Sequence, residues 1–172
     1  MRLILFDGPA ETRAKFYPLA LSRPIWELRC GMTSLVEKLI AKVGAADVAC
    51  WVPDYMADAY ARRTGMKVND PGSLTGDDLL VVHGSVKAAS CQAKPGGPSK
   101  VYTDDDGNVL CAWITKADLA KLKTGSLEDL LASAGKSLAA EACECPRYEY
   151  IWDLILENPG QLTEDFKAAG RS

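Results

Sequence analysis

Three short, mostly apolar runs constrain the fold of this chain more than any other feature. They are Leu3–Phe6 (LILF), Asp47–Val52 (DVACWV) and Leu79–Val82 (LLVV). Short runs without polar alternation are typical of strands that are buried on both faces, as in parallel sheets. Helical patterns lie between the runs. Strands that alternate with helices predict an α/β fold built on a doubly wound sheet.

Start and stop signals mark three helices. The first follows Ser34, which is spaced to form a capping box with Glu37, and Gly44 supplies its end. We expect the second helix within Pro53–Gly65 and the third within Ser126–Gly135, where the final glycine ends each apolar pattern.

The second half of the chain has a different pattern. Val101–Thr103 and Val109–Ile114 flank the polar tip Asp104–Asn108, an arrangement typical of a β-hairpin. The glycine- and proline-rich stretch Lys94–Ser99 precedes the hairpin as a loop. Tyr150–Glu157 is strongly apolar and ends at an Asn-Pro-Gly sequence. We expect its large side chains to pack against the sheet or against a partner.

Composition places the chain among ordinary globular proteins. It has 172 residues, 48% of them hydrophobic and 25% charged, and we expect a single domain over residues 1–172. The net charge of −3, without a basic cluster, excludes a general nucleic-acid-binding protein. No apolar run suits a signal peptide or approaches the roughly 20 residues of a membrane span. We therefore expect a cytoplasmic protein with no membrane partner.

Six cysteines and one histidine give no metal-binding pattern. Cys143 and Cys145 form a Cys-x-Cys, but the paired Cys-x-x-Cys motifs of a zinc ribbon are missing, and His83 is the only histidine. Cys50 and Cys111 lie within apolar runs, where free cysteines serve as small core residues. We expect reduced, structural thiols and no metal ligand among the side chains.

The connection Phe6–Gly31, between the first strand and the first helix, is the strongest candidate for a functional loop. In an open α/β sheet, ligands bind beyond the carboxyl ends of the strands, and long loops in compact domains are usually functional. The alternative is a solvated loop whose cations pair with nearby acidic side chains. The cations that could hold phosphate oxygens are Arg13, Lys15, Arg23 and Arg29.

The order of motifs in this loop resembles that of the sugar-phosphate nucleotidyltransferases. The matching motifs are Phe-Asp-Gly-Pro at 6–9, Pro-Leu at 18–19, Arg-Pro at 23–24, Glu-Leu-Arg-Cys-Gly at 27–31, Trp-Asp-Leu at 152–154 and Asn-Pro at 158–159. The chain is similar to the N-terminal domain of GlmU-like sugar-phosphate nucleotidyltransferases, in a divergent and shortened form. The resemblance implies a three-layer, Rossmann-like fold with a mostly parallel sheet.

The resemblance also implies a reaction, the transfer of a nucleotidyl group from a nucleoside triphosphate to a sugar 1-phosphate with release of pyrophosphate. Lys15, or alternatively Arg13, stands where a triphosphate-contacting cation is expected, and Arg23 lies on the phosphate-binding side. Lys15 and Arg23 are therefore the catalytic candidates. The residues expected to bind the nucleotide are Phe6, Asp7, Gly8, Arg13, Arg29, His83, Gly84 and Ser85.

Three positions depart from the family's pattern. The turn Asp7–Ala10 has fewer glycines than a phosphate-binding loop, and Ile25 replaces the lysine expected after Pro24. The resemblance implies Mg²⁺ as cofactor, but Ser85 stands where the carboxylate ligand is expected, and a hydroxyl is a poor substitute. His83 has either a structural role or a contact with phosphate or ribose.

These departures leave three functions open. The first is an active nucleotidyltransferase, with a nucleoside triphosphate and a sugar 1-phosphate as partners. The second is a catalytically degenerate module that binds a nucleotide or nucleotide sugar and regulates an attached domain. The third is an assembly domain that uses the apolar segment 150–156. The resemblance allows a C-terminal β-helix domain and a homo-oligomer, with this chain as the first part of a longer protein or as a stand-alone form.

Overall fold

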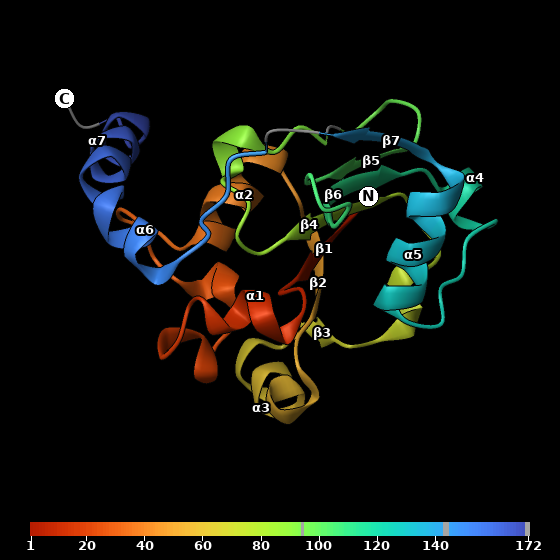
Figure 1. The fold of residues 1–172 in the computed structure, drawn as a ribbon, viewed down its shortest axis with the longest axis horizontal. Coiled ribbons are helices and arrows are strands. Elements are labelled where there is room, and N and C mark those ends of the chain that lie inside the picture. Colours follow the sequence, from red (N-terminus) through yellow and green to blue (C-terminus); the bar gives the residue numbers. More distant parts are fainter. Residues whose placement is uncertain (94, 143–144, 171–172) are drawn as a thin grey trace.

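A seven-stranded sheet forms the centre of the molecule. The computed structural model describes residues 1–93, 95–142 and 145–170. The strands in this part of the chain lie in the order β3-β2-β1-β4-β6-β5-β7 (Figure 1). Their bounds are β1 (Arg2–Phe6), β2 (Asp47–Trp51), β3 (Lys67–Val68), β4 (Leu79–His83), β5 (Lys100–Thr103), β6 (Val109–Ile114) and β7 (Ala139–Ala142).

Most strand pairs are parallel. β1 pairs in parallel with β2 and β4, β2 with β3, and β5 with β7. Only β6 runs the other way among the described strands, antiparallel to β4 and β5. The three apolar runs of the sequence become the neighbouring strands β2, β1 and β4, and every residue of β4 is buried. The predicted mostly parallel, Rossmann-like sheet is confirmed.

Helices cover both faces of the sheet and make three layers (Figure 1). Side chains of α2 and α3 enter the core on one face, and those of α4 and α5 enter it on the other. No helix in the described ranges is long and apolar enough to cross a membrane. The helix bounds are α1 (Ala10–Ala14), α2 (Leu35–Val43), α3 (Asp54–Thr64), α4 (Lys116–Leu119), α5 (Leu127–Ser137), α6 (Ile151–Leu156) and α7 (Asn158–Ala168). Short 3₁₀ turns are η1 (Leu19–Leu21), η2 (Ile25–Glu27), η3 (Pro71–Leu74) and η4 (Ala88–Ser90).

Local capping signals set the ends of α2 as expected. Ser34 and Glu37 form the capping box, and Gly44 ends the helix in a left-handed conformation with φ of 67°. A left-handed residue after the last turn satisfies free carbonyls, and glycine adopts that conformation without a steric penalty. The second expected helix, α3, ends in the same way at Gly65.

The third expected helix is longer than predicted. α5 continues through Gly135 to Ser137, and the amide of Leu138 still donates to the carbonyl of Ala134. Buried Leu130 and Ala134 hold the helix on the sheet, so packing outweighs the modest cost of one interior glycine. The prediction that the helix stops at Gly135 is wrong.

The predicted hairpin is confirmed as β5 and β6, which pair antiparallel around the tip 104–108. The amide of Asp104 donates to the carbonyl of Asn108 at 3.0 Å and closes the turn. The preceding loop was expected over Lys94–Ser99, and its first residue lies outside the described residues. The neighbouring strand β7 has no hydrophobic signal in the sequence, because all four of its residues are exposed. Only backbone pairing with β5 defines it.

The apolar segment near the C-terminus forms α6, and α7 follows where the sequence predicted a break. Leu154 packs in a cluster beneath α6 with residues of the Phe6–Gly31 loop. Trp152 and Ile155, however, are 53% and 71% exposed, so the prediction that they pack on the sheet is wrong. Their packing against a partner stays a prediction. Residues one or two positions apart lie on different sides of an α-helix. With Leu154 facing inward, Trp152 and Ile155 therefore face away from the core.

Four cysteines are free and buried, as expected, namely Cys30, Cys50, Cys91 and Cys111. Cys145 is disulfide-bonded, so the expectation of a reduced thiol is wrong at this position. Cys143, the other member of the Cys-x-Cys pair, lies outside the described residues.

Candidate functional site

The carboxyl ends of three parallel strands meet at one edge of the sheet. Phe6, the last residue of β1, is in register with Trp51 of β2 and His83 of β4. Two of the connections that leave this edge are the loop that begins at Asp7 and the one that begins at Gly84. This edge is where open α/β sheets bind ligands. The fold therefore brings both segments singled out in the sequence to one place.

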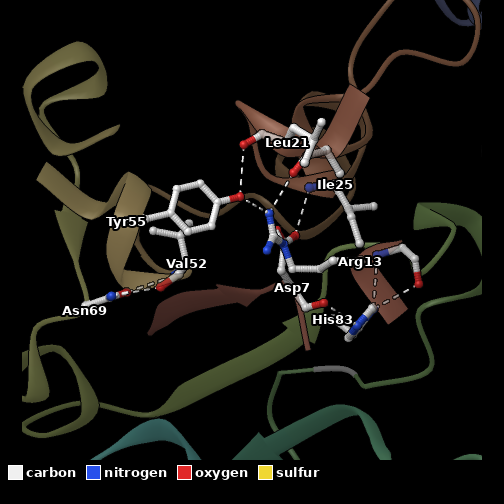
Figure 2. A network of polar contacts seen from close by, with 10 residues as sticks. Asp7, Arg13, Leu21, Ile25, Val52, Tyr55, Asn69 and His83 are labelled. Carbon is white, nitrogen blue, oxygen red and sulfur yellow. Dashed lines mark hydrogen bonds and ion pairs between the residues drawn. The ribbon is translucent and has the colours of Figure 1, made fainter. Parts of the chain in front are cut away.

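A buried ion pair lies directly beyond β1. The Nε atom of Arg13 donates to Oδ2 of Asp7 at 3.1 Å (Figure 2). The two residues are only 3% and 2% exposed. Arg13 was predicted to bind the nucleotide, but the structure places it inside the protein. A phosphate group could reach it only after this ion pair and its surroundings had opened.

The ion pair belongs to a larger polar network. Nη2 of Arg13 donates to the carbonyl of Ala20 at 2.6 Å and to the hydroxyl of Tyr55 at 2.8 Å. That hydroxyl in turn donates to the carbonyl of Leu21 at 2.9 Å. Oδ1 of Asp7 accepts from the amide of Ile25 at 2.8 Å. Figure 2 shows these contacts converging from α1, from α3 and from the loop that follows β1.

Burial changes the protonation of Asp7. Loss of solvent raises the pKa of this carboxyl from 3.8 to about 7, although the amide of Ile25 and the charge of Arg13 oppose the rise. In the unfolded chain the same carboxyl ionises near its ordinary value. Between pH 4 and pH 7 the folded state therefore holds a proton that the unfolded state has lost, and the contribution of Asp7 to stability falls as the pH rises.

This linkage predicts a pH-dependent effect of Asp7→Asn. The stability of the wild type minus that of the variant should decrease from pH 4.5 to about pH 7 and then level off, because asparagine does not titrate. Urea unfolding at pH 4.5, 6.0, 7.0 and 8.0 measures the difference. Asp58→Asn removes a carboxylate on the exposed side of α3 and serves as the matched control. A difference that grows with pH would contradict the prediction.

His83 is buried at the same edge, and both nitrogens of its ring have hydrogen-bond partners within the protein. Its Nδ1 lies 2.9 Å from the hydroxyl of Ser85 and accepts from the Ser85 amide at 3.2 Å. Nε2 lies 3.1 Å from the carbonyl of Asp7 and therefore carries the proton. Burial and the charge of Arg147 lower the pKa of His83 to about 4, so the ring is neutral at pH 7. Both ring nitrogens serve contacts within the protein.

Two glycines allow the loops to approach each other at this edge. Gly8 has a φ of 69°, and a Cβ atom there would lie 2.6 Å from Nε2 of His83. A Cβ atom on Gly84 would lie 2.8 Å from Cε3 of Trp26 and 3.2 Å from Oδ1 of Asp7. These glycines permit close packing between the two loops, which does not require a phosphate ligand.

Three of the predicted cations lie on the surface. Lys15, Arg23 and Arg29 are exposed, in contrast to Arg13. The ammonium group of Lys15 lies 5.1 Å from the ring centre of Tyr150, which in turn stacks on Trp152. The structure thus gathers seven predicted residues in one cluster, in which Gly8 is half-buried and the others, Phe6, Asp7, Arg13, His83, Gly84 and Ser85, are buried. It leaves Lys15, Arg23 and Arg29 outside this cluster.

Sequence reasoning missed two members of the network. Tyr55 looked like an ordinary helix residue, yet it lies 42 positions from the arginine that it contacts. Ile25 contributes its backbone amide, and a backbone contribution leaves no signature in residue type. The one signal available in the sequence was an Asp and an Arg six positions apart in the same loop.

The residues present do not fit a protein-bound Mg²⁺ ion. Ser85 is fully buried and its hydroxyl contacts His83, while both oxygens of Asp7 accept hydrogen bonds from the protein. No group of three or more metal-ligating side chains occurs in the described ranges. Magnesium sites in proteins use at least one or two free carboxylates, so no catalytic step is assigned to a resident metal here.

One buried donor at this edge has no acceptor. Among the described side chains, Nε1 of Trp51 is buried without a hydrogen-bond partner. An unsatisfied buried donor costs about 1–3 kcal/mol and calls for a specific explanation. Trp51 is the last residue of β2 and is in register with Phe6 at the carboxyl end of β1.

Comparison with known proteins identifies the family to which this chain belongs. Residues 3–172 match the family described as sugar nucleotidyl transferase. The chain belongs to this family, as its motifs predicted, and membership supports nucleotidyl transfer in general. No curated protein matches the sequence.

Three solved structures share the fold of this chain. CTP:phosphocholine cytidylyltransferase (LicC) of Streptococcus pneumoniae matches with a TM-score of 0.56 and 12% identity, over 92% of this chain and 97% of that one. A protein assigned as a glucose-1-phosphate thymidylyltransferase, from Bacillus anthracis, matches with a TM-score of 0.56 and 10% identity, over 94% and 95%. Molybdopterin-guanine dinucleotide biosynthesis protein A of Archaeoglobus fulgidus matches with a TM-score of 0.52 and 10% identity, over 92% and 97%. At such low identity the likeness shows the shared fold.

Proposed function

We propose that this protein transfers a nucleotidyl group from a nucleoside triphosphate to a sugar 1-phosphate. The observation that carries the proposal is the position of Lys15 and Arg23. Both are exposed cations on the loop that leaves the carboxyl end of β1, in a chain of the sugar nucleotidyl transferase family. A phosphate oxygen of the sugar 1-phosphate attacks the α-phosphorus, the bond to the β-phosphate breaks, and pyrophosphate leaves.

This reaction demands alignment and charge neutralisation more than covalent chemistry. Lys15 and Arg23 are the groups that we assign to the triphosphate, and Arg29 adds a third exposed cation to the same loop. Arg supplies parallel donors to phosphate oxygens, and Lys supplies a compact charge. The turn at Phe6–Gly8 and the segment His83–Ser85 form the floor beneath the nucleotide in this proposal, because they end β1 and β4.

A pyrophosphate-release assay tests the proposal. The purified chain is incubated with each of the four nucleoside triphosphates, a set of hexose 1-phosphates and Mg²⁺ supplied in solution. Arg23→Ala and Lys15→Ala should each lower kcat/KM about ten- to hundredfold, the range expected for losing one charge-assisted phosphate contact. Lys123→Ala removes an exposed cation between α4 and α5 and serves as the control. Release that is unaffected by both loop variants would exclude this site.

A second function is favoured by a separate observation. Ser85 replaces the expected carboxylate, and its hydroxyl is held by His83. A domain with this arrangement could bind a nucleotide or nucleotide sugar without catalysing transfer. Calorimetric titration with nucleoside triphosphates and nucleotide sugars distinguishes the two functions. Binding that depends on Arg23 but is never followed by pyrophosphate release would favour the binding module over the enzyme.

A further inference from the structure

We propose that Asp7, Arg13 and Tyr55 form a clasp that fixes residues 20–25 and thereby positions Arg23. In this assignment Arg13 and Tyr55 are positioning residues that act through Arg23 and do not touch the substrate. The inference deepens the proposed function, and its functional half rests on the assignment of Arg23 to the triphosphate.

The clasp holds both ends of the segment that carries Arg23. At the first end, the Arg13 guanidinium donates to the carbonyl of Ala20 at 2.6 Å, and the Tyr55 hydroxyl donates to the carbonyl of Leu21 at 2.9 Å. At the second end, Asp7 accepts from the amide of Ile25 at 2.8 Å. The Asp7–Arg13 ion pair joins the two ends. Arg23 lies between these anchors and is exposed (Figure 2 shows the anchors).

The segment has little regular structure of its own to hold it. It spans the end of η1 and the start of η2, and each of these 3₁₀ turns has three residues. Such short turns are marginal in isolation, so tertiary contacts decide where the segment lies. The long loop that joins β1 to α2 would otherwise give Arg23 many positions. Fixing the backbone before the ligand arrives reduces the entropy lost on binding.

The same contacts argue against a phosphate role for Arg13. Its Nε and Nη2 atoms donate to Asp7, Ala20 and Tyr55, and its charge is paired with that of Asp7 when this carboxyl is ionised. Its guanidinium also lies 5.6 Å from the ring centre of Tyr55. The guanidinium of Arg13 therefore stabilises the loop and is not available to a phosphate group.

Tyr55→Phe tests the clasp without threatening the fold, because Tyr55 is 64% exposed and only its hydroxyl is removed. Hydrogen exchange of peptides that cover residues 17–28 should become at least about threefold faster, since the Leu21 carbonyl and Arg13 each lose a partner. Tyr102→Phe, on β5 in the other half of the sheet, removes a tyrosine hydroxyl away from the loop and should leave this exchange unchanged. Unchanged exchange in Tyr55→Phe would overturn the clasp, whatever the activity.

A double-mutant cycle tests whether the clasp acts through Arg23. Tyr55→Phe should weaken nucleoside triphosphate binding about five- to tenfold, and this effect should vanish in an Arg23→Ala background. If Tyr55→Phe weakens binding equally in both backgrounds, the positioning role is overturned. If exchange rises but Arg23→Ala binds normally, Arg23 does not contact the triphosphate. That result would overturn both the proposed phosphate site and the role of the clasp in positioning Arg23 for the triphosphate. The faster exchange would still show that the clasp holds residues 20–25, so the two failures can be distinguished.

Discussion

Arg13→Met should lower the free energy of unfolding by about 3–5 kcal/mol at pH 8, the cost expected when one partner of a buried ion pair is removed. Asp7 would lose its cation while remaining buried and held by the amide of Ile25. The carbonyl of Ala20 would also lose its donor. Methionine retains much of the length of the side chain, so the loss reports mainly on charge and hydrogen bonds.

Denaturant unfolding measures this effect, and Arg63→Met provides the matched control. Arg63 pairs with Glu27 at 2.7 Å, but its side chain is largely exposed. Exposed ion pairs contribute about 0–1 kcal/mol, so the control should change stability little. Equal losses in the two variants would mean that the Asp7–Arg13 pair does not stabilise the fold. At pH 5 the loss in Arg13→Met should be smaller, because Asp7 is then protonated and needs no cation.

Gly8→Ala should cost about 2–5 kcal/mol of stability through two separate effects. The residue has a φ of 69°, and an L side chain in the left-handed region costs about 1–2 kcal/mol. The new methyl group would also lie 2.6 Å from Nε2 of His83, whose ring is buried. Relieving that overlap requires the ring to move and its contact with the carbonyl of Asp7 to lengthen, which adds about 1–3 kcal/mol.

Gly44→Ala separates these two effects. Gly44 ends α2 with a φ of 67°, nearly the same as that of Gly8, but nothing lies within 4 Å of its added Cβ atom. The variant should therefore show the backbone cost alone. Thermal or urea unfolding of both variants gives the difference as the cost of the overlap with His83. If the two variants lose the same stability, the loops at the edge of the sheet are less closely packed than the structure indicates.

Local signals in the sequence were sufficient for the framework of the fold. The runs that became β1, β2 and β4 could be recognised because a strand buried on both faces must be apolar along its length. The capping box at Ser34 and Glu37 and the left-handed glycine at 44 could be read because they act within one helical turn. β7 could not be predicted, because its exposed Ala-Ala-Glu-Ala sequence has no pattern and its partner strand supplies the backbone pairing.

The candidate site was predicted from its place after β1, and the roles of its residues depend on contacts between distant parts of the chain. Sequence spacing grouped Arg13 with Lys15 and Arg23 as equivalent cations of one loop. The fold buries Arg13 against Asp7 and Tyr55 and leaves the other two exposed. Sequence spacing shows which residues are close together along the chain. It does not show which of them will be buried, and burial decides whether a cation is paired within the protein or is available to a ligand.

The amino-acid sequence by itself determined the strands β1, β2, β4, β5 and β6, the glycine ends of α2 and α3, the loop that carries the cations and the family to which the chain belongs. These features depend on hydrophobic periodicity, on capping within a few residues and on short motifs. Only the tertiary structure decided that Arg13 and His83 make their contacts inside the protein and that α6 exposes Trp152. It also decided that the segment carrying Arg23 is held from α1, from α3 and from the turn after β1. Those outcomes depend on burial and on contacts between residues far apart in the chain, and a buried charge takes its partner from the whole fold.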